Sequence, residues 1–145
     1  MTALRGATLY VDSNVLIYAL EGRSSWNAVA VRLLEQAARG TCVIVTGDAA
    51  MAEVLVGAHR SPEPTAVGDV EAMFESPLVA VLPHSHEAFL SAALIRGTVG
   101  GQLIDALHLA TAIKAGCDAV VSHDTGMPRL PQMPVLRLDE LGLAY

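Results

Sequence analysis

The chain has 145 residues, the size of one domain, and we expect a single domain over residues 1–145. Hydrophobic residues make up 52% of it and charged residues only 17%, a balance that excludes intrinsic disorder. The net charge of −6 argues against a basic module that holds nucleic acid through its overall field, although it leaves room for a site where metal ions supply positive charge.

Short runs of β-branched residues alternate with longer helical patterns along the whole chain. In chain order, the patterns predict a strand over 7–12, helices over 14–22 and 26–39, a strand over 42–46, helices over 49–59 and 66–75, a strand over 78–82, helices over 84–96 and 103–115, and strands over 118–122 and 135–138. Apolar strands that alternate with helices indicate an α/β fold, with a central parallel sheet of four to five strands flanked by helices.

Polar residues next to these elements predict how the helices begin. Ser24 or Ser25 can cap the second helix, and Thr46 or Asp48 can cap the third. His84 is expected on the surface, at the start of the fifth helix.

Two cysteines are too few for a disulfide scaffold or a cysteine zinc site. Cys42 and Cys117 both lie in apolar runs, so we expect buried, reduced thiols. The N-terminus lacks a signal-peptide layout, and no apolar run approaches the ~18 residues of a membrane span. We therefore expect a cytoplasmic protein that does not associate with a membrane. The apolar excess suggests that a partner subunit covers part of its surface.

Two carboxylates follow strands of the predicted sheet. Asp12 ends the first strand, and Asp124 lies two residues beyond the fourth. A single aspartate in such a place often only caps a helix or forms a turn. Because ligands bind beyond the carboxyl ends of parallel strands, two of them at one edge indicate a site.

Two further carboxylates lie within apolar helical patterns. Glu53 is the only charge in 49–59, and Asp105 is the only full charge in 97–113. Lone carboxylates are seldom buried unless they are paired or bound to metal. The alternatives are a solvated helix face for Glu53 and, for Asp105, a favourable interaction with the helix dipole of about 0.3–1 kcal/mol.

If these four carboxylates converge, they repel one another unless a cation lies between them. Mg²⁺ and Mn²⁺ prefer oxygen ligands, whereas the absence of a Cys/His set points away from zinc. Two such ions about 3.5–4 Å apart would hold the attacking water and the leaving oxygen of a phosphodiester.

Four stretches carry a resemblance to a known family: YVDSNVLIYAL (10–20), AEVLVG (52–57), DALHLATA (105–112) and VVSHD (120–124). In this order and spacing, the chain resembles PIN-domain ribonucleases, most closely the VapC toxins of toxin–antitoxin pairs. The resemblance implies a PIN-like three-layer α/β sandwich. It also implies four acids that bind metal and act in catalysis, listed as Asp12, Glu53, Asp105 and Asp124.

Two polar residues match supporting positions of that family. Asn14 matches the residue that orients the first aspartate, and Ser122 matches the hydroxyl beside the last acid. The implied activity is Mg²⁺- or Mn²⁺-dependent endoribonuclease cleavage of RNA by metal-activated water. The implied partners are the RNA substrate, a cognate antitoxin protein and a second copy in a homodimer. One departure is the proline-rich run after Asp124, where the family usually has a phenylalanine.

Other functions remain open from the residues alone. A haloacid-dehalogenase-like phosphatase or a receiver domain would also place an aspartate after its first strand, but both expect a lysine past a late strand, and Lys114 lies in a helix before the fourth. A phosphatase would also want an aspartate where Asn14 stands. A catalytically quiet PIN-like binding module is the third reading, although retention of four acids argues against it.

Histidine and aromatic residues near these motifs have two readings each. His108 lies one turn from Asp105 on the same helix face, where it either holds a carboxylate or is a core histidine. His123, beside Asp124, is a candidate contact to substrate or metal. Trp26, Tyr10 and Tyr18 could stack RNA bases, but their spacing fits core or interface packing better.

Overall fold

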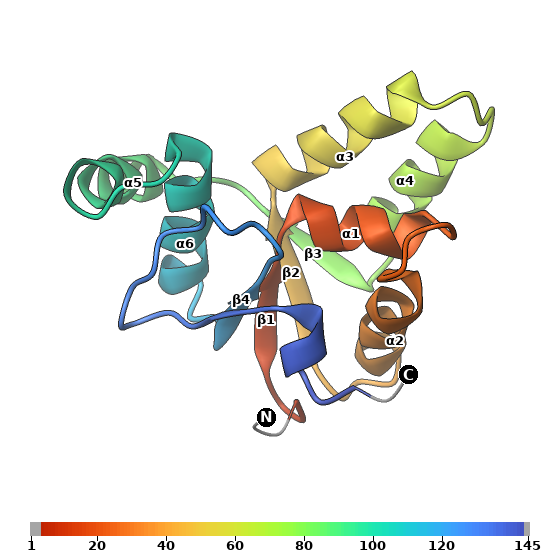
Figure 1. The fold of residues 1–145 in the computed structure, drawn as a ribbon, viewed down its shortest axis with the longest axis horizontal. Helices are drawn as coiled ribbons and strands as arrows, with labels where there is room; N and C mark the ends of the chain where they lie inside the picture. Colours follow the sequence, from red (N-terminus) through yellow and green to blue (C-terminus); the bar gives the residue numbers. More distant parts are fainter. Residues whose placement is uncertain (1–3, 144–145) are drawn as a thin grey trace.

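The computed structural model describes residues 4–143 and contains a five-stranded sheet with six α-helices (Figure 1). The elements in chain order are β1 (Thr8–Val11), α1 (Ser13–Leu20), α2 (Asn27–Ala38), β2 (Val43–Gly47), α3 (Asp48–Arg60), α4 (Ala66–Glu75), β3 (Val79–Leu82), α5 (His86–Thr98), α6 (Leu103–Lys114), β4 (Ala119–Val121), β5 (Val135–Leu136) and a 3₁₀ helix (Leu138–Glu140). Every predicted strand and helix is present, with bounds that differ by at most two residues.

The sheet is parallel throughout, in the order β3-β2-β1-β4-β5. Successive side chains of β1 point to opposite faces of the sheet and so pack into two separate hydrophobic cores. Leu9 and Val11 pack on the side of α1, α2, α3 and α4, and Tyr10 packs on the side of α6. Helix α5 packs on α6, so helices cover both faces of the sheet, as in the predicted sandwich (Figure 1).

The strand order places a crevice at the end of β1. From β1 the chain moves outward to β2 and β3, and then returns to lay β4 on the other side of β1. The connections on the two sides of β1 therefore diverge at its carboxyl end, which is where open α/β sheets bind ligands. Asp12, directly after β1, and Ser122, directly after β4, meet at this point.

The predicted side-chain caps of α2 and α3 are wrong. The Ser24 hydroxyl accepts the N–H of Trp26 at 3.1 Å in the turn before α2, but α2 has no side-chain cap. Thr46 does not cap α3, because its hydroxyl donates to the Val11 carbonyl at 2.6 Å and ties β2 to β1. Asp48 is the first residue of α3 rather than its cap.

The prediction that His84 lies on the surface at the start of a helix is wrong. Ser85 caps α5 by accepting the N–H of Ala88 at 3.1 Å, and His84 turns inward before it. Its Nε2 accepts the N–H of Ala49 at 3.2 Å, so a histidine from a distant loop satisfies one of the free N–H groups at the start of α3.

Both cysteines are buried and free within the described residues, as expected. No helix among residues 4–143 has the length and apolar character needed to cross a membrane. Several large apolar side chains nevertheless remain exposed on α5 and around the start of α6: Phe89, Leu90, Leu94, Val99, Leu103 and Ile104.

Candidate functional site

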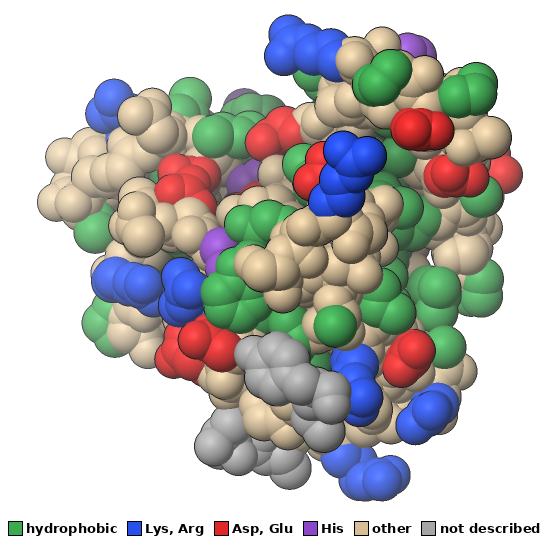
Figure 2. Space-filling view, turned by 45° about the vertical axis from the view of Figure 1, so that its right-hand side comes forward, with side chains coloured by type: hydrophobic (Ala, Val, Ile, Leu, Met, Phe, Trp, Pro, Cys, Tyr) green, Lys and Arg blue, Asp and Glu red, His purple; other side chains and the backbone are tan. Residues whose placement is uncertain are grey.

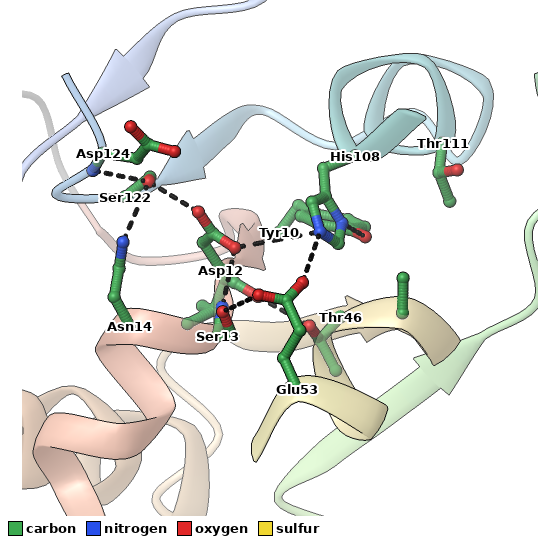
Figure 3. Close-up of polar contacts among 12 residues, drawn as sticks. Tyr10, Asp12, Ser13, Asn14, Thr46, Glu53, His108, Thr111, Ser122 and Asp124 are labelled. Atoms are coloured by element: carbon green, nitrogen blue, oxygen red, sulfur yellow. Dashed lines mark hydrogen bonds and ion pairs between the residues drawn. The ribbon is translucent and has the colours of Figure 1, made fainter. Parts of the chain in front are cut away.

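Asp12 is fixed in place at the junction of β1 and α1. The residue is only 5% exposed, and its backbone occupies the N-cap position of α1. One oxygen, Oδ1, accepts the Ser13 N–H at 2.7 Å, and the other, Oδ2, accepts the Ser122 hydroxyl at 2.7 Å (Figure 3). Asp12 therefore caps a helix and also faces the end of β4.

Ser122 connects the loop after β4 to Asp12. Its Oγ accepts the N–H of Asp124 at 3.0 Å and lies 3.5 Å from Asn14 Nδ2 (Figure 3). The other end of the Asn14 amide accepts the N–H of His123 at 3.3 Å. Asn14 therefore contacts Ser122 and the loop, and not Asp12 itself. Ser122 in turn donates to Asp12, so Asn14 is linked to the first aspartate through Ser122.

Asp105 and Asp124 lie side by side despite their like charges. A Cβ atom built on Gly126 would lie 3.2 Å from Asp124 Oδ1 and 3.9 Å from Asp105 Oδ2, so both carboxylates border one small residue. Asp105, in the first turn of α6, is 5% exposed. Burial, and then repulsion from Asp124, raise the pKa of Asp105 to about 6. This is the effect expected of converging carboxylates.

Glu53 reaches the site from α3 and is not buried, since its side chain is 50% exposed. The next residue, Val54, takes the core position on α3, and the turn of about 100° per residue leaves Glu53 at the rim. The Ser13 hydroxyl donates to Glu53 Oε2 at 3.1 Å, and His108 Nε2 lies 3.7 Å from Oε1. The nearby His108 ring and the Ser13 hydroxyl lower the pKa of Glu53, against the effect of burial.

Tyr10 and His84 lie next to His108, behind the carboxylates, and the sequence did not predict them as part of the site. Tyr10, fully buried, places its hydroxyl 2.6 Å from Nδ1 of His108. It lies two residues before Asp12 and so on the same face of β1, a spacing that could have indicated it. His84 places its Nδ1 2.7 Å from the Thr111 hydroxyl, with its ring 5.7 Å from that of His108. No sequence signal distinguished His84.

His123 contributes to packing rather than to the acidic cluster. Its ring lies edge-on to Trp26, with ring centroids 4.3 Å apart, and 5.5 Å from Tyr18. Its Nε2 accepts the Leu138 N–H at 3.1 Å. Burial, and then the charge of Arg137, lower the pKa of His123. The three aromatic rings therefore fit the packing interpretation.

Oxygen atoms dominate this edge, as a hard divalent cation requires. In the space-filling view, acidic side chains and histidines lie near one another across the middle of the face (Figure 2). Within residues 4–143, however, no three His, Cys, Asp or Glu side chains already form a metal cage. The acids present fit a hard divalent cation that keeps several of its waters better than one enclosed by protein ligands alone.

Comparisons with known proteins agree with this fold. The family model described as PIN domain matches residues 9–132. No curated protein sequence matches the chain.

Two solved structures illustrate the similarity. A toxin–antitoxin complex from Klebsiella pneumoniae has 19% identity and a TM-score of 0.71, over 90% of this chain and 97% of that one. VapC20 from Mycobacterium tuberculosis, described as a Sarcin-Ricin loop cleaving toxin, has 20% identity and a TM-score of 0.67, over 82% of this chain and 92% of that one. From the family match over most of its length, the chain belongs to the PIN domain family.

Proposed function

We propose that the chain is a divalent-metal-dependent endoribonuclease of the VapC toxin type, which hydrolyses RNA phosphodiester bonds and is neutralised by a cognate antitoxin. The observation that supports this proposal is the proximity of carboxylates from separate segments: Asp12 and Glu53 each lie within 4 Å of His108 Nε2, and the charges of Asp124 and Asp12 raise the pKa of Asp105. These carboxylates are Asp12, Glu53, Asp105 and Asp124. Membership of the PIN domain family favours this reading over a phosphatase or receiver domain.

The proposed cofactor is Mg²⁺ or Mn²⁺, held mainly by Asp12, Asp105 and Asp124. When bound, such ions lower the pKa of water and stabilise charge on a leaving oxygen. The protein's part is to hold oxygen ligands in place. Ser122 and the Ser13 N–H each donate to one oxygen of Asp12, which fixes the carboxylate and leaves further lone pairs free. A cation would also relieve the repulsion between Asp105 and Asp124.

Glu53 is proposed to act at the open side of the site. The nearby His108 ring and the hydrogen bond from Ser13 lower its pKa, and half of its side chain is exposed to solvent on the side where a substrate would enter. Of the four candidate acids, Glu53 is the most exposed. Glu53 is therefore the carboxylate best placed to contact a phosphate-bound ion or a departing proton.

The net charge of −6 and the acidic edge repel a phosphate backbone. RNA affinity should therefore depend on the ions more than on the protein's own field. RNA is proposed as the substrate because the similar protein from M. tuberculosis is described as cleaving the Sarcin-Ricin loop. Selection of one RNA loop by its shape would suit such a site.

The proposed partners are an antitoxin and a second copy of the chain. The similar structure from K. pneumoniae is a toxin–antitoxin complex. We propose that partners cover the exposed apolar residues of α5 and α6. A small protein should copurify with the chain when its neighbouring gene is coexpressed, and sedimentation should detect a dimer. A strict monomer at all concentrations would refute the homodimer.

The test is RNA cleavage by purified, partner-free protein with Mg²⁺ or Mn²⁺, with and without a chelator. We expect cleavage with metal, none with chelator, and none from Asp12→Asn. Glu71→Gln is the matched control, because it removes one carboxylate from an exposed position on α4 and should cleave like the wild type. If the wild type cuts no RNA with either ion, the proposal fails and a catalytically quiet binding module is favoured.

A further inference from the structure

His108 is the one buried side chain of the described residues that leaves a polar atom, Nε2, without a hydrogen-bond partner. The residue is only 1% exposed, and this atom is directed at the acidic edge (Figure 3). It lies 3.9 Å from Asp12 Oδ1 and 3.7 Å from Glu53 Oε1. Buried nitrogen atoms normally have partners, so this one is expected to act on something in the site.

We propose that Tyr10 fixes the tautomer of His108, so that Nε2–H enters the acidic site as a hydrogen-bond donor and the ring is withheld as a metal ligand. The tautomer follows from the contacts alone, whereas its effect on metal choice rests on the proposed metal-dependent function. Tyr10 and His108 are thus positioning residues for Asp12 and Glu53. Together they determine which ions the carboxylates take.

The Tyr10 hydroxyl fixes one end of the ring. It carries a single proton and is fully buried, with His108 Nδ1 at 2.6 Å as its acceptor. The neighbouring His84 does not compete for this proton, because its Nε2 accepts the Ala49 N–H and its Nδ1 faces Thr111. If Nδ1 of His108 carried a proton instead, the tyrosine proton would be left buried without an acceptor among the described residues.

The carboxylates favour the same tautomer at the other end of the ring. A lone pair on Nε2 would face two negatively charged groups within 4 Å, whereas an N–H there is attracted to both. A small movement brings Nε2–H into hydrogen-bond range of Asp12 or Glu53. This donor draws the half-exposed Glu53 toward Asp12, with only the Ser13 hydroxyl as additional support.

This arrangement has a consequence for metal choice. Imidazole nitrogen suits Zn²⁺ and Ni²⁺, whereas carboxylates and water suit Mg²⁺ and Mn²⁺. A nitrogen that carries a proton cannot ligate a metal, and the lone pair of His108 is occupied by Tyr10. Loss of the Tyr10 hydroxyl would free Nδ1 to take the proton and would expose a nitrogen lone pair beside Asp12 and Glu53. Tyr10 therefore keeps an oxygen site from becoming a zinc site.

The tautomer is measured on metal-free, ¹⁵N-histidine-labelled protein at neutral pH by long-range ¹H–¹⁵N correlation. The His108 signals are assigned by their loss in His108→Gln. We expect a proton on Nε2 and none on Nδ1. A proton on Nδ1, or on both nitrogens, would overturn the proposal. This experiment requires no enzymatic activity and no variant other than His108→Gln, so it determines the tautomer even if Tyr10→Phe fails to fold.

Metal choice is measured by calorimetric titration of Zn²⁺ and Mn²⁺ into wild type and Tyr10→Phe. We expect the affinity for Zn²⁺ relative to Mn²⁺ to rise about tenfold in Tyr10→Phe, the size of effect typical for residues behind metal ligands. Tyr18→Phe, which removes a hydroxyl away from His108, should leave the ratio unchanged. Adding His108→Gln to Tyr10→Phe should abolish the gain, because no imidazole remains.

An unchanged ratio in folded Tyr10→Phe, or a gain that survives His108→Gln, would overturn the role in metal choice. Failure of the wild type to bind Mn²⁺ or Mg²⁺ would refute the proposed metal-dependent nuclease and the metal choice with it. The tautomer measured by NMR does not depend on metal binding, so failure of the tautomer proposal and failure of the proposed function are distinguishable.

Discussion

Asp105→Asn should make the metal-free protein more stable while it abolishes activity. In the absence of a cation, burial and the neighbouring Asp124 oppose ionisation of Asp105 and raise its pKa to about 6. Asparagine keeps the size of the side chain but carries no charge, so it removes this opposition. The same substitution removes an oxygen ligand of the proposed metal site.

The magnitude follows from the pKa. A rise from 3.8 to about 6 is roughly two units, and each unit corresponds to about 1.4 kcal/mol, which sets an upper bound of about 3 kcal/mol. Solvent on the open side of the site screens the repulsion, so we expect about 1–2 kcal/mol in the free energy of unfolding.

The raised pKa of Asp105 also determines how the stability of the wild type changes with pH. Because the folded protein binds the proton more tightly than the unfolded chain, wild-type stability falls as pH rises from about 4 to about 6. The advantage of Asp105→Asn is therefore complete at neutral pH and disappears below about pH 4.

The assay is urea unfolding of metal-free wild type and Asp105→Asn at several pH values, then with added Mg²⁺. Glu71→Gln, with the same change of charge on an exposed helix face, should unfold like the wild type. Mg²⁺ should stabilise the wild type and not Asp105→Asn. If Asp105→Asn were less stable than the wild type at neutral pH without metal, the reasoning from repelling carboxylates would be refuted.

Three further substitutions test other parts of the site. Ser122→Ala removes the hydroxyl that donates to Asp12, and calorimetry should show metal affinity about 10–100-fold lower than in the wild type. Unchanged affinity would contradict the positioning role of Ser122. Glu53→Gln should change unfolding free energy by no more than about 0.5 kcal/mol because the side chain is half exposed, yet slow RNA cleavage; full activity would exclude Glu53 from the site. Gly47→Ala would press a methyl group against the Tyr10 hydroxyl and should lower the thermal-unfolding free energy by about 1–3 kcal/mol, whereas equal stability would show that this packing yields easily.

The sheet and its helices could be predicted because the signals are local. Each strand is a short apolar run, and each helix repeats apolar residues at helical spacing. The position of Asp12 and Asp105 followed from the same signals, since one ends a buried strand and the other begins a nearly all-apolar helix. Both are indeed 5% exposed.

The remaining features depend on contacts between distant segments. The sequence left Glu53 as either a site carboxylate among apolar neighbours or part of a solvated helix face, and only the packing of α3 shows that Val54 takes the core position and leaves Glu53 at the rim. Asn14 contacts Ser122, 108 residues away, and no local pattern indicates that pairing. His84 was assigned to the surface because its role at Ala49 exists only when α3 and the loop before α5 meet.

The central claim is that carboxylate-held ions, and not the RNA's own 2′-hydroxyl, drive cleavage. The most direct measurement compares cleavage of one RNA with cleavage of the same RNA carrying a single 2′-deoxy nucleotide at the cut site, in Mn²⁺ and in chelator. We predict that both substrates are cut in Mn²⁺ and that neither is cut in chelator. Cleavage that persists in chelator and is lost with the 2′-deoxy nucleotide would contradict the account.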